Sequence, residues 1–168
     1  HARLTKTEDQ RVLQEVISHI KTMCTRLQVA QPTREYAQSI VVEFWEKRKT
    51  IGGGRLGQKA APLGAAALYI ALKKRNTART IKEVCGASGV TNKKMIQRAF
   101  KAIVDTLNMQ TGVMEAGDLI DRFGSQLGIS FKLCRVCDHV ARRAVDLNIA
   151  SSRRHATIAA TAIYVTML

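Results

Sequence analysis

The hydrophobic residues of this chain recur at intervals of three and four positions, which is the spacing of the buried face of an amphipathic helix. The first such segment is predicted at about residues 8–28, with Thr7 as its cap. Its apolar positions are Val12, Leu13, Val16, Ile17, Ile20, Met23, Cys24 and Leu27. Two more helices are expected at about 32–48 and 61–75. No segment alternates with period two, so the sequence predicts an all-α protein.

Two further helices are predicted after these three. Thr80 and Glu83 have the spacing of a capping box, which opens a fourth helix that the glycines of GASGV close. A fifth helix is expected from the cap Thr91 to about residue 107, with Val90 and Met95 as a hydrophobic staple around that cap. Together the five segments form one helical unit.

The order of hydrophobic positions then begins again. Ile20, Leu27, Val29 and Ile40 are followed 100 residues later by Ile120, Leu127, Ile129 and Val140. In the third helix Tyr69 is matched by Tyr164 at a spacing of 95, and we attribute the difference to a longer loop around the glycines at 52–54. The chain is therefore predicted to be a tandem repeat of residues 1–110 and 111–168, whose second copy stops after its third helix.

Charge narrows the class of partner. Among 168 residues the chain has 27 Lys and Arg but 13 Asp and Glu, so its net charge is +14, and most of the excess lies in the first repeat. Such a surface repels itself, which indicates a polyanionic partner, either nucleic acid or an acidic protein. A basic surface that serves only solubility is the alternative. No apolar run is long enough to span a membrane, no signal peptide is visible, and the four cysteines are expected to be reduced thiols.

No arrangement of residues indicates a metal site. Cys134, Cys137 and His139 lie close in sequence, but a zinc site needs four ligands and no second Cys-x-x-Cys pair exists. Both cysteines fit the apolar stripe of a helix, so we predict that they lie in the core and that His139 lies on the polar face. The other members of this stripe are Leu133, Val136, Val140, Ala141 and Ala144.

No arrangement of residues indicates catalysis either, so we expect that the protein is not an enzyme. The segment GGGRLG matches a dinucleotide fingerprint only formally, because no strand precedes it. We interpret it as a flexible loop whose Arg55, with Lys59 beyond it, can follow a phosphate backbone.

Residues 80–103 are typical of a helix-turn-helix whose second helix opens with Lys93 and Lys94. Cations at a helix start oppose the macrodipole and cost about 0.3–1 kcal/mol each when exposed. One explanation is a tolerated surface penalty. We favour an anion-binding site, since free backbone N–H groups and two ammonium groups meet there, with the basic residues 73–75 on a neighbouring helix.

Five stretches carry a resemblance to a known family. AAALYIA, ARTIKEV and GVTNKKMIQRAFKAI, with GDLIDRFGSQLGISFKLCRVCDHVARRAVDL and ATIAATAIYV in the second repeat, resemble the cyclin-fold core of transcription factor IIB. The resemblance implies tandem five-helix cyclin-like repeats, the second incomplete in this chain. It also implies a nuclear, monomeric, non-enzymatic initiation factor that binds TATA-binding protein on promoter DNA and bridges it to RNA polymerase II. The family's zinc ribbon would lie outside this chain, and no cofactor is expected within it.

The resemblance also implies site residues. Those expected to contact DNA are Arg55, Gly57, Gln58, Lys59, Arg98, Arg153 and Arg154. Those expected to meet acidic side chains of TATA-binding protein or another partner are Lys73, Lys74, Arg75, Lys93 and Lys94. The chain departs from the family at 152–155, where many members have Gly-Arg-Ser-Pro, and at Asp105, where many have a lysine. The base-reading helix-turn-helix of the family's second repeat lies outside this chain, so we expect DNA binding to depend mostly on charge.

Two other functions share this fold. The related RNA polymerase III initiation factor has the same repeats, and a cyclin, the regulatory subunit of a kinase, has the same five-helix unit. The charge of the first repeat and the lysine pair at 93–94 favour DNA together with an acidic partner.

Overall fold

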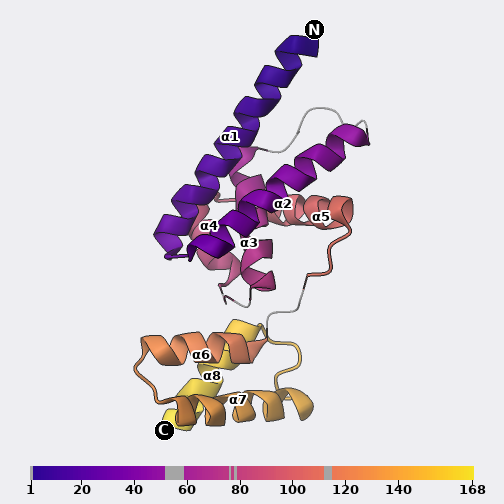
Figure 1. Cartoon of the computed structure of the whole chain (residues 1–168). Helices are drawn as coiled ribbons and strands as arrows, with labels where there is room; N and C mark the ends of the chain where they lie inside the picture. The colour runs from indigo at the N-terminus through magenta and orange to yellow at the C-terminus, as the bar shows by residue number, and fades with distance from the viewer. Residues whose placement is uncertain (1, 52–58, 76, 78, 112–114) are drawn as a thin grey trace. The chain divides into compact units, whose positions relative to one another are not determined.

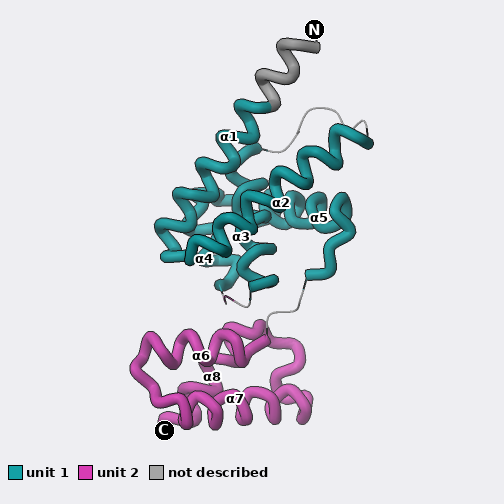
Figure 2. The backbone as a smooth tube through the Cα atoms, in the orientation of Figure 1, with its two compact units in different colours: residues 1–75, 79–112 teal, residues 76–78, 113–168 magenta. Residues whose placement is uncertain are grey.

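The computed structural model is α-helical, as the sequence predicts (Figure 1). It describes residues 2–51, 59–75, 77, 79–111 and 115–168, with the side chains of the first helix from Gln10 onward. Within these residues there are eight helices and no strand. The helices belong to two compact units (Figure 2). Unit 1 comprises residues 1–75 and 79–112, and unit 2 comprises residues 76–78 and 113–168.

Unit 1 is built around one helix that is buried on all sides. Its helices are α1 (Ala2–Leu27), α2 (Gln31–Thr50), α3 (Ala60–Lys74), α4 (Ile81–Ser88) and α5 (Lys93–Leu107). The central helix α3 contacts the other four, and its residues 65–68 are completely buried. Small side chains permit this close packing, because a Cβ at Gly64 would lie 3.2 Å from the carbonyl oxygen of Val16 in α1. The run of alanines therefore has a packing role.

Cap residues determine where α4 and α5 begin. The predicted capping box is confirmed: the Thr80 N–H donates to Glu83 Oε2 (2.7 Å), and the Glu83 N–H donates to Thr80 Oγ1 (3.3 Å). A glycine with φ 69° ends α4, also as predicted. The cap of α5 is Asn92 rather than Thr91, because the Asn92 Oδ1 accepts the Lys94 N–H at 3.0 Å.

Two further predictions in unit 1 are wrong. Because the cap of α5 moves by one residue, Val90 and Met95 no longer stand at the staple positions, and Val90 packs against the core by itself. The first helix begins at Ala2, so Thr7 lies inside it and does not cap it. Residues 2–7 contain no glycine or proline that would stop the helix.

Unit 2 consists of α6 (Ala116–Gln126), α7 (Phe131–Asp146) and α8 (His155–Met167), each of which contacts the other two. Its core includes Leu119, Ile120, Ala159 and Ala162. Cys134 and Cys137 are buried in this core and His139 is exposed, as predicted. Val136 departs from the predicted apolar stripe, because it is 48% exposed on a side of α7 that neither neighbour covers.

The two units repeat the same order of three helices. α2 and α7 begin 100 residues apart, at Gln31 and Phe131, and each follows an extended cap residue with φ −61° and ψ 148°. α3 and α8 begin 95 residues apart, at Ala60 and His155. The predicted reason for this difference is wrong. Helix α2 has 20 residues and α7 has 16, so helix length explains most of it, and the left-handed Asn148 (φ 58°) follows the early end of α7.

Candidate nucleic-acid interface

Both third helices start on an exposed basic residue. Lys59 is the N-cap of α3 (φ −60°, ψ 143°), and Arg154 is the N-cap of α8 (φ −71°, ψ 140°), 95 residues later. Neither side chain caps its own helix, and no acidic residue stands in either first turn. The first backbone N–H groups of both helices therefore lack a side-chain acceptor and have a positive side chain beside them. A phosphate oxygen suits this arrangement.

The structure describes four of the seven residues that are predicted to contact DNA. Arg153 precedes Arg154 and is exposed like it, which puts two guanidinium groups at the start of α8. Arg98 is exposed on α5 in unit 1. The predicted contacts that lie outside the described residues are Arg55, Gly57 and Gln58.

Helix α5 carries a basic stripe. Lys94, Arg98 and Lys101 are exposed at spacings of four and three residues, on the side opposite the face that packs into the core. Lys93, at the first position of the helix, is partly buried. The sequence analysis missed Lys101, although its spacing from the other two was the available signal. The stripe offers a row of cations to an acidic surface.

The basic end of α3 is only partly available to a partner. The Lys73 ammonium lies over the rings of Tyr69 (5.4 Å) and Phe100 (5.8 Å), and the residue is half-buried. Burial lowers the pKa of Lys73 below its ordinary value. The Arg75 guanidinium lies 5.5 Å from the centre of a tyrosine ring in α2. Lys74 is exposed, which leaves its ammonium available.

The two predicted lysine clusters lie on neighbouring helices, at different positions along the axis of α5. Lys73 lies over Phe100, in the middle of α5, whereas Lys93 starts that helix. The rise of an α-helix places Phe100 about 10 Å from Lys93 along the helix axis. A partner surface that extends along α5 would therefore contact both clusters.

Lys59, Lys94 and Arg98 are not neutralised by carboxylates within the described part of the chain. Ion pairs among the described residues include those of His19 with Glu15, Lys49 with Glu46, and Arg142 with Asp138. None of these pairs involves the three basic residues. Their charges remain available to an external anion.

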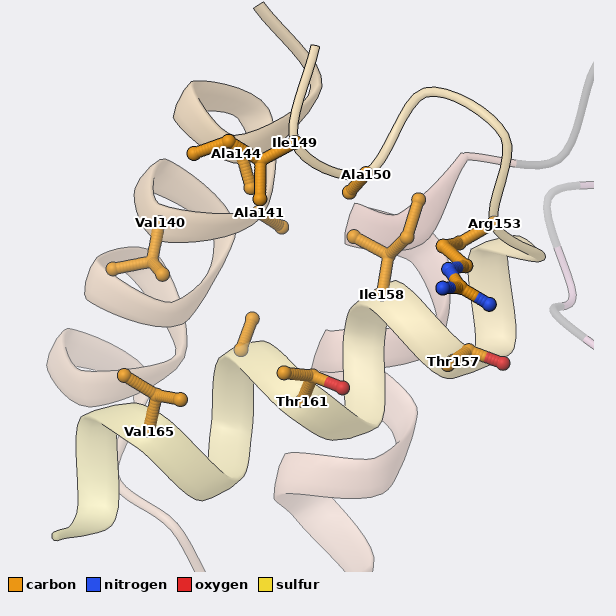
Figure 3. A pocket seen from close by; sticks show the side chains of 11 residues that line it. Val140, Ala141, Ala144, Ile149, Ala150, Arg153, Thr157, Ile158, Thr161 and Val165 are labelled. Carbon is orange, nitrogen blue, oxygen red and sulfur yellow. The ribbon is translucent and has the colours of Figure 1, made fainter. Parts of the chain in front are cut away.

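Unit 2 has an apolar groove beside the basic start of α8 (Figure 3). It has a volume of about 360 Å³ and lies between α7, α8 and the segment that joins them. Residues along it include Val140, Ala144, Ile158 and Val165. Arg153 is the single charged residue among those that line it, so the groove has no pair of groups for acid–base catalysis. In unit 1 the corresponding helices, α2 and α3, are both packed against α5.

Among the described residues nothing supports metal binding, and nothing supports nucleophilic chemistry at Cys24. Burial raises the pKa of Cys24 to about 11, against an opposing effect of the Arg34 charge, and a protonated thiol is a poor nucleophile. Within the described ranges no group of three or more His, Cys, Asp or Glu side chains could hold a metal ion. None of the helices in these ranges is long and apolar enough to cross a membrane.

Known proteins resemble the chain along nearly its whole length. The family model of the transcription factor TFIIB repeat matches residues 9–106 and 109–168. Over 162 residues, or 96% of this chain, the sequence is 28% identical to transcription initiation factor IIB of Xenopus laevis and of Homo sapiens, covering 49% of each. It is 27% identical to the factor of the same name from Drosophila melanogaster, covering 50% of it. The chain thus spans about half the length of these curated relatives.

Proposed function

Since the chain belongs to the transcription factor TFIIB repeat family, we propose that it is the core of a transcription initiation factor of the IIB type. In this proposal the core binds TATA-binding protein on promoter DNA and joins that complex to RNA polymerase II in the nucleus. It acts as a monomer and performs no catalysis. The relatives from frog, human and fly are all called transcription initiation factor IIB, which supports this assignment.

The observation that carries the proposal is the repeated basic helix start. Lys59 and Arg154 hold equivalent positions in the two repeats, and each stands beside backbone N–H groups that lack a side-chain acceptor. DNA presents a regular series of phosphates, so two such starts in one chain can contact the backbone at two places. Contacts of this kind position a protein on the duplex without reading bases.

The stripe of Lys94, Arg98 and Lys101 supports the protein half of the proposal. These cations are exposed on one face of α5, and Lys74 is exposed on the adjacent helix α3. An acidic surface of a partner would be complementary to them, and complementary charge favours fast and specific association. We assign this surface to TATA-binding protein and the two helix starts to DNA. This assignment moves Arg98, which the sequence predicts as a DNA contact, to the surface that meets the partner protein.

An electrophoretic mobility shift assay on a duplex with a TATA element tests the proposal. We expect the chain to supershift the complex of TATA-binding protein with this duplex, and the supershift should weaken steeply with salt. Lys59→Glu with Arg154→Glu should reduce the slope of log affinity against log salt by about 2. Lys93→Glu with Lys94→Glu should remove the ternary complex while the circular dichroism spectrum stays helical.

A matched control separates these sites from net charge. Lys21→Glu with Lys132→Glu changes the net charge equally at exposed positions of α1 and α7, and it should leave the supershift nearly intact. If this control weakens binding as much as the other pairs do, the surfaces assigned above are wrong. Absence of any ternary complex, together with co-purification of a kinase, would support the cyclin alternative instead.

A further inference from the structure

One exposed hydroxyl group lies beside the basic start of α8. Thr157 is exposed in the first turn of this helix, three residues after Arg154, and it lines one end of the groove together with Arg153 (Figure 3). Its backbone N–H donates to the Arg154 carbonyl (2.8 Å), and its hydroxyl makes no hydrogen bond with another described residue. The hydroxyl is therefore free to react.

We propose that Thr157 is a phosphorylation site for a protein serine/threonine kinase that prefers basic substrates, and that its phosphate switches off the DNA contact of Arg153 and Arg154. Kinases of this class have acidic substrate grooves, and charge patterns of this kind decide which substrates a kinase accepts. Two arginines three and four residues before the acceptor supply the complementary charge. The second part of this inference rests on the proposed DNA contact, and the first part does not.

The start of α8 can open to admit a kinase. A kinase binds its substrate in an extended form, so the first helical turn has to unwind. Arg154 gives this helix no side-chain cap, and its first turn contains no acidic residue. Both features weaken the first turn, which is where helices fray. Arg153 and Arg154 already lie outside the helix, which begins at His155.

The reaction itself needs only a nucleoside triphosphate and the kinase. The Thr157 oxygen forms a bond to the γ-phosphorus of ATP, the bond from that phosphorus to the bridging oxygen of ADP breaks, and a base of the kinase takes the hydroxyl proton. The product carries about −1.5 to −2 charges at neutral pH. This charge forms beside two guanidinium groups and the positive end of the helix, so it competes directly with DNA phosphate.

Two other positions in the chain are less suitable than Thr157. Its equivalent in the first repeat, 95 residues earlier, is the buried Pro62, which has no hydroxyl group. Thr50 is exposed and also follows basic residues, but its hydroxyl donates to the Lys47 carbonyl (2.7 Å) at the end of α2. A phosphate at a helix C-terminus is disfavoured by the dipole. The switch would thus act on the second repeat alone.

The test treats the 168-residue chain with ATP and the catalytic subunit of protein kinase A, and maps phosphate by mass spectrometry. We expect phosphate at Thr157, and a rate about tenfold lower in Arg154→Ala. A kinase that prefers acidic residues around its acceptor should leave Thr157 unmodified. Absence of phosphate at Thr157, or phosphate at Thr50 in its place, overturns the site.

Two readouts test the consequence. For the phosphorylated chain, the slope of log DNA affinity against log salt should decrease by about 2, because two phosphate contacts are lost. Its melting temperature should rise by about 2 °C, because the first turn of α8 gains a negative charge. Thr157→Glu should shift both readouts in the same directions, and Thr161→Glu, one turn further along α8, should not. Unchanged DNA binding by the phosphorylated chain overturns the switch.

A third variant separates this inference from the proposed function. If Arg153→Ala with Arg154→Ala binds DNA as well as the unmodified chain does, the proposed DNA contact is wrong. Stoichiometric phosphate at Thr157 with a raised melting temperature would then still establish the modification site.

Discussion

Gln28 and Gly128 occupy the same left-handed backbone position 100 residues apart, at φ 51° and φ 69°. In both units the N–H of the following residue donates to a carbonyl five residues earlier, at 2.9 Å after α1 and at 2.8 Å after α6. The two helices therefore end in the same way, with a single left-handed residue. The duplication is visible in the backbone even where the side chains differ.

Gln28→Gly should stabilise unit 1. A side chain with a Cβ pays a penalty in the left-handed region that glycine avoids, although glycine also gains entropy in the unfolded chain. We expect a net increase of about 0.5–1 kcal/mol in the free energy of unfolding. Gly128→Ala should lose about 1 kcal/mol in unit 2 for the converse reason. Urea titration followed by circular dichroism measures both changes.

Gly86→Ala is the control for these substitutions. Gly86 lies inside α4, and a Cβ there would meet no atom within 4 Å. Alanine should therefore gain stability at this position. If Gly128→Ala lowers stability while Gly86→Ala raises it, the backbone conformation at Gly128 explains the loss. A loss of stability in both variants would contradict that explanation.

The crossing of α6 and α7 depends on the absence of a side chain at Gly124. A Cβ at this position would overlap the Cys134 thiol, which is buried between the two helices. Gly124→Ala should therefore destabilise unit 2 by about 1–3 kcal/mol, as overpacking does in other cores. Chemical denaturation measures the effect.

A second substitution should restore this crossing. Cys134→Ala alone leaves a small cavity and lowers stability. In the double variant Gly124→Ala with Cys134→Ala, the new methyl group occupies the space of the lost sulfur, so the double variant should be more stable than Gly124→Ala. Additive losses would show that the two residues do not compete for the same space.

Sequence reasoning identified the elements that local chemistry determines. Helical periodicity placed the helices, and the capping box of Thr80 with Glu83 formed as predicted. Periodicity also placed Cys134 and Cys137 in the core, because their spacing continues an apolar stripe. The 100-residue offset of the repeats was readable for the same reason.

Features that depend on tertiary contacts could not be predicted from the sequence. The sequence marked the end of α3 as a cluster of three free charges, yet Lys73 lies over two aromatic rings, one of which belongs to a distant segment. The prediction of a helix start failed where two neighbouring residues could both act as the cap, as at Thr91 and Asn92. The basic helix starts at Lys59 and Arg154 became equivalent only once both helix boundaries were known.

Stability of unit 1 should fall as the pH rises above about 9. Burial raises the pKa of Cys24 from 9.0 to about 11. Between these values the unfolded chain has lost the thiol proton and the folded chain retains it, so stability decreases with rising pH. Well below pH 9.0 both states are protonated, and this dependence vanishes.

Cys24→Val isolates the Cys24 contribution, because tyrosines and lysines also titrate at high pH. The free energy of unfolding of this variant should fall less steeply between about pH 9 and pH 11 than that of the parent chain. Equal slopes in the variant and the parent chain would contradict the raised pKa of Cys24. A maleimide at about pH 8 should also label Cys24 slowly in the folded chain and quickly in urea.

Lys74 should contribute more to partner binding than Lys73. The Lys73 ammonium is half-buried over the rings of Tyr69 and Phe100, whereas Lys74 is exposed. Lys74→Gln should therefore weaken the ternary complex by about two- to fivefold, a typical effect of a rim charge. Lys73→Met retains the apolar stem and should change affinity less than about twofold. Titration in the mobility shift assay compares them, and the reverse order of effects would contradict the structural assignment.

Asp105 interrupts the basic stripe of α5. It is exposed four residues after Lys101, so it continues the row with the opposite charge. Asp105→Lys should extend the stripe by one turn and strengthen the ternary complex by about two- to fivefold at low salt, mainly through faster association. The gain should shrink above about 0.3 M salt, where surface charges are screened. Asp121→Lys adds the same charge on α6 of unit 2, where it is also exposed. An equal gain from Asp121→Lys would mean that net charge, and not the stripe, determines affinity.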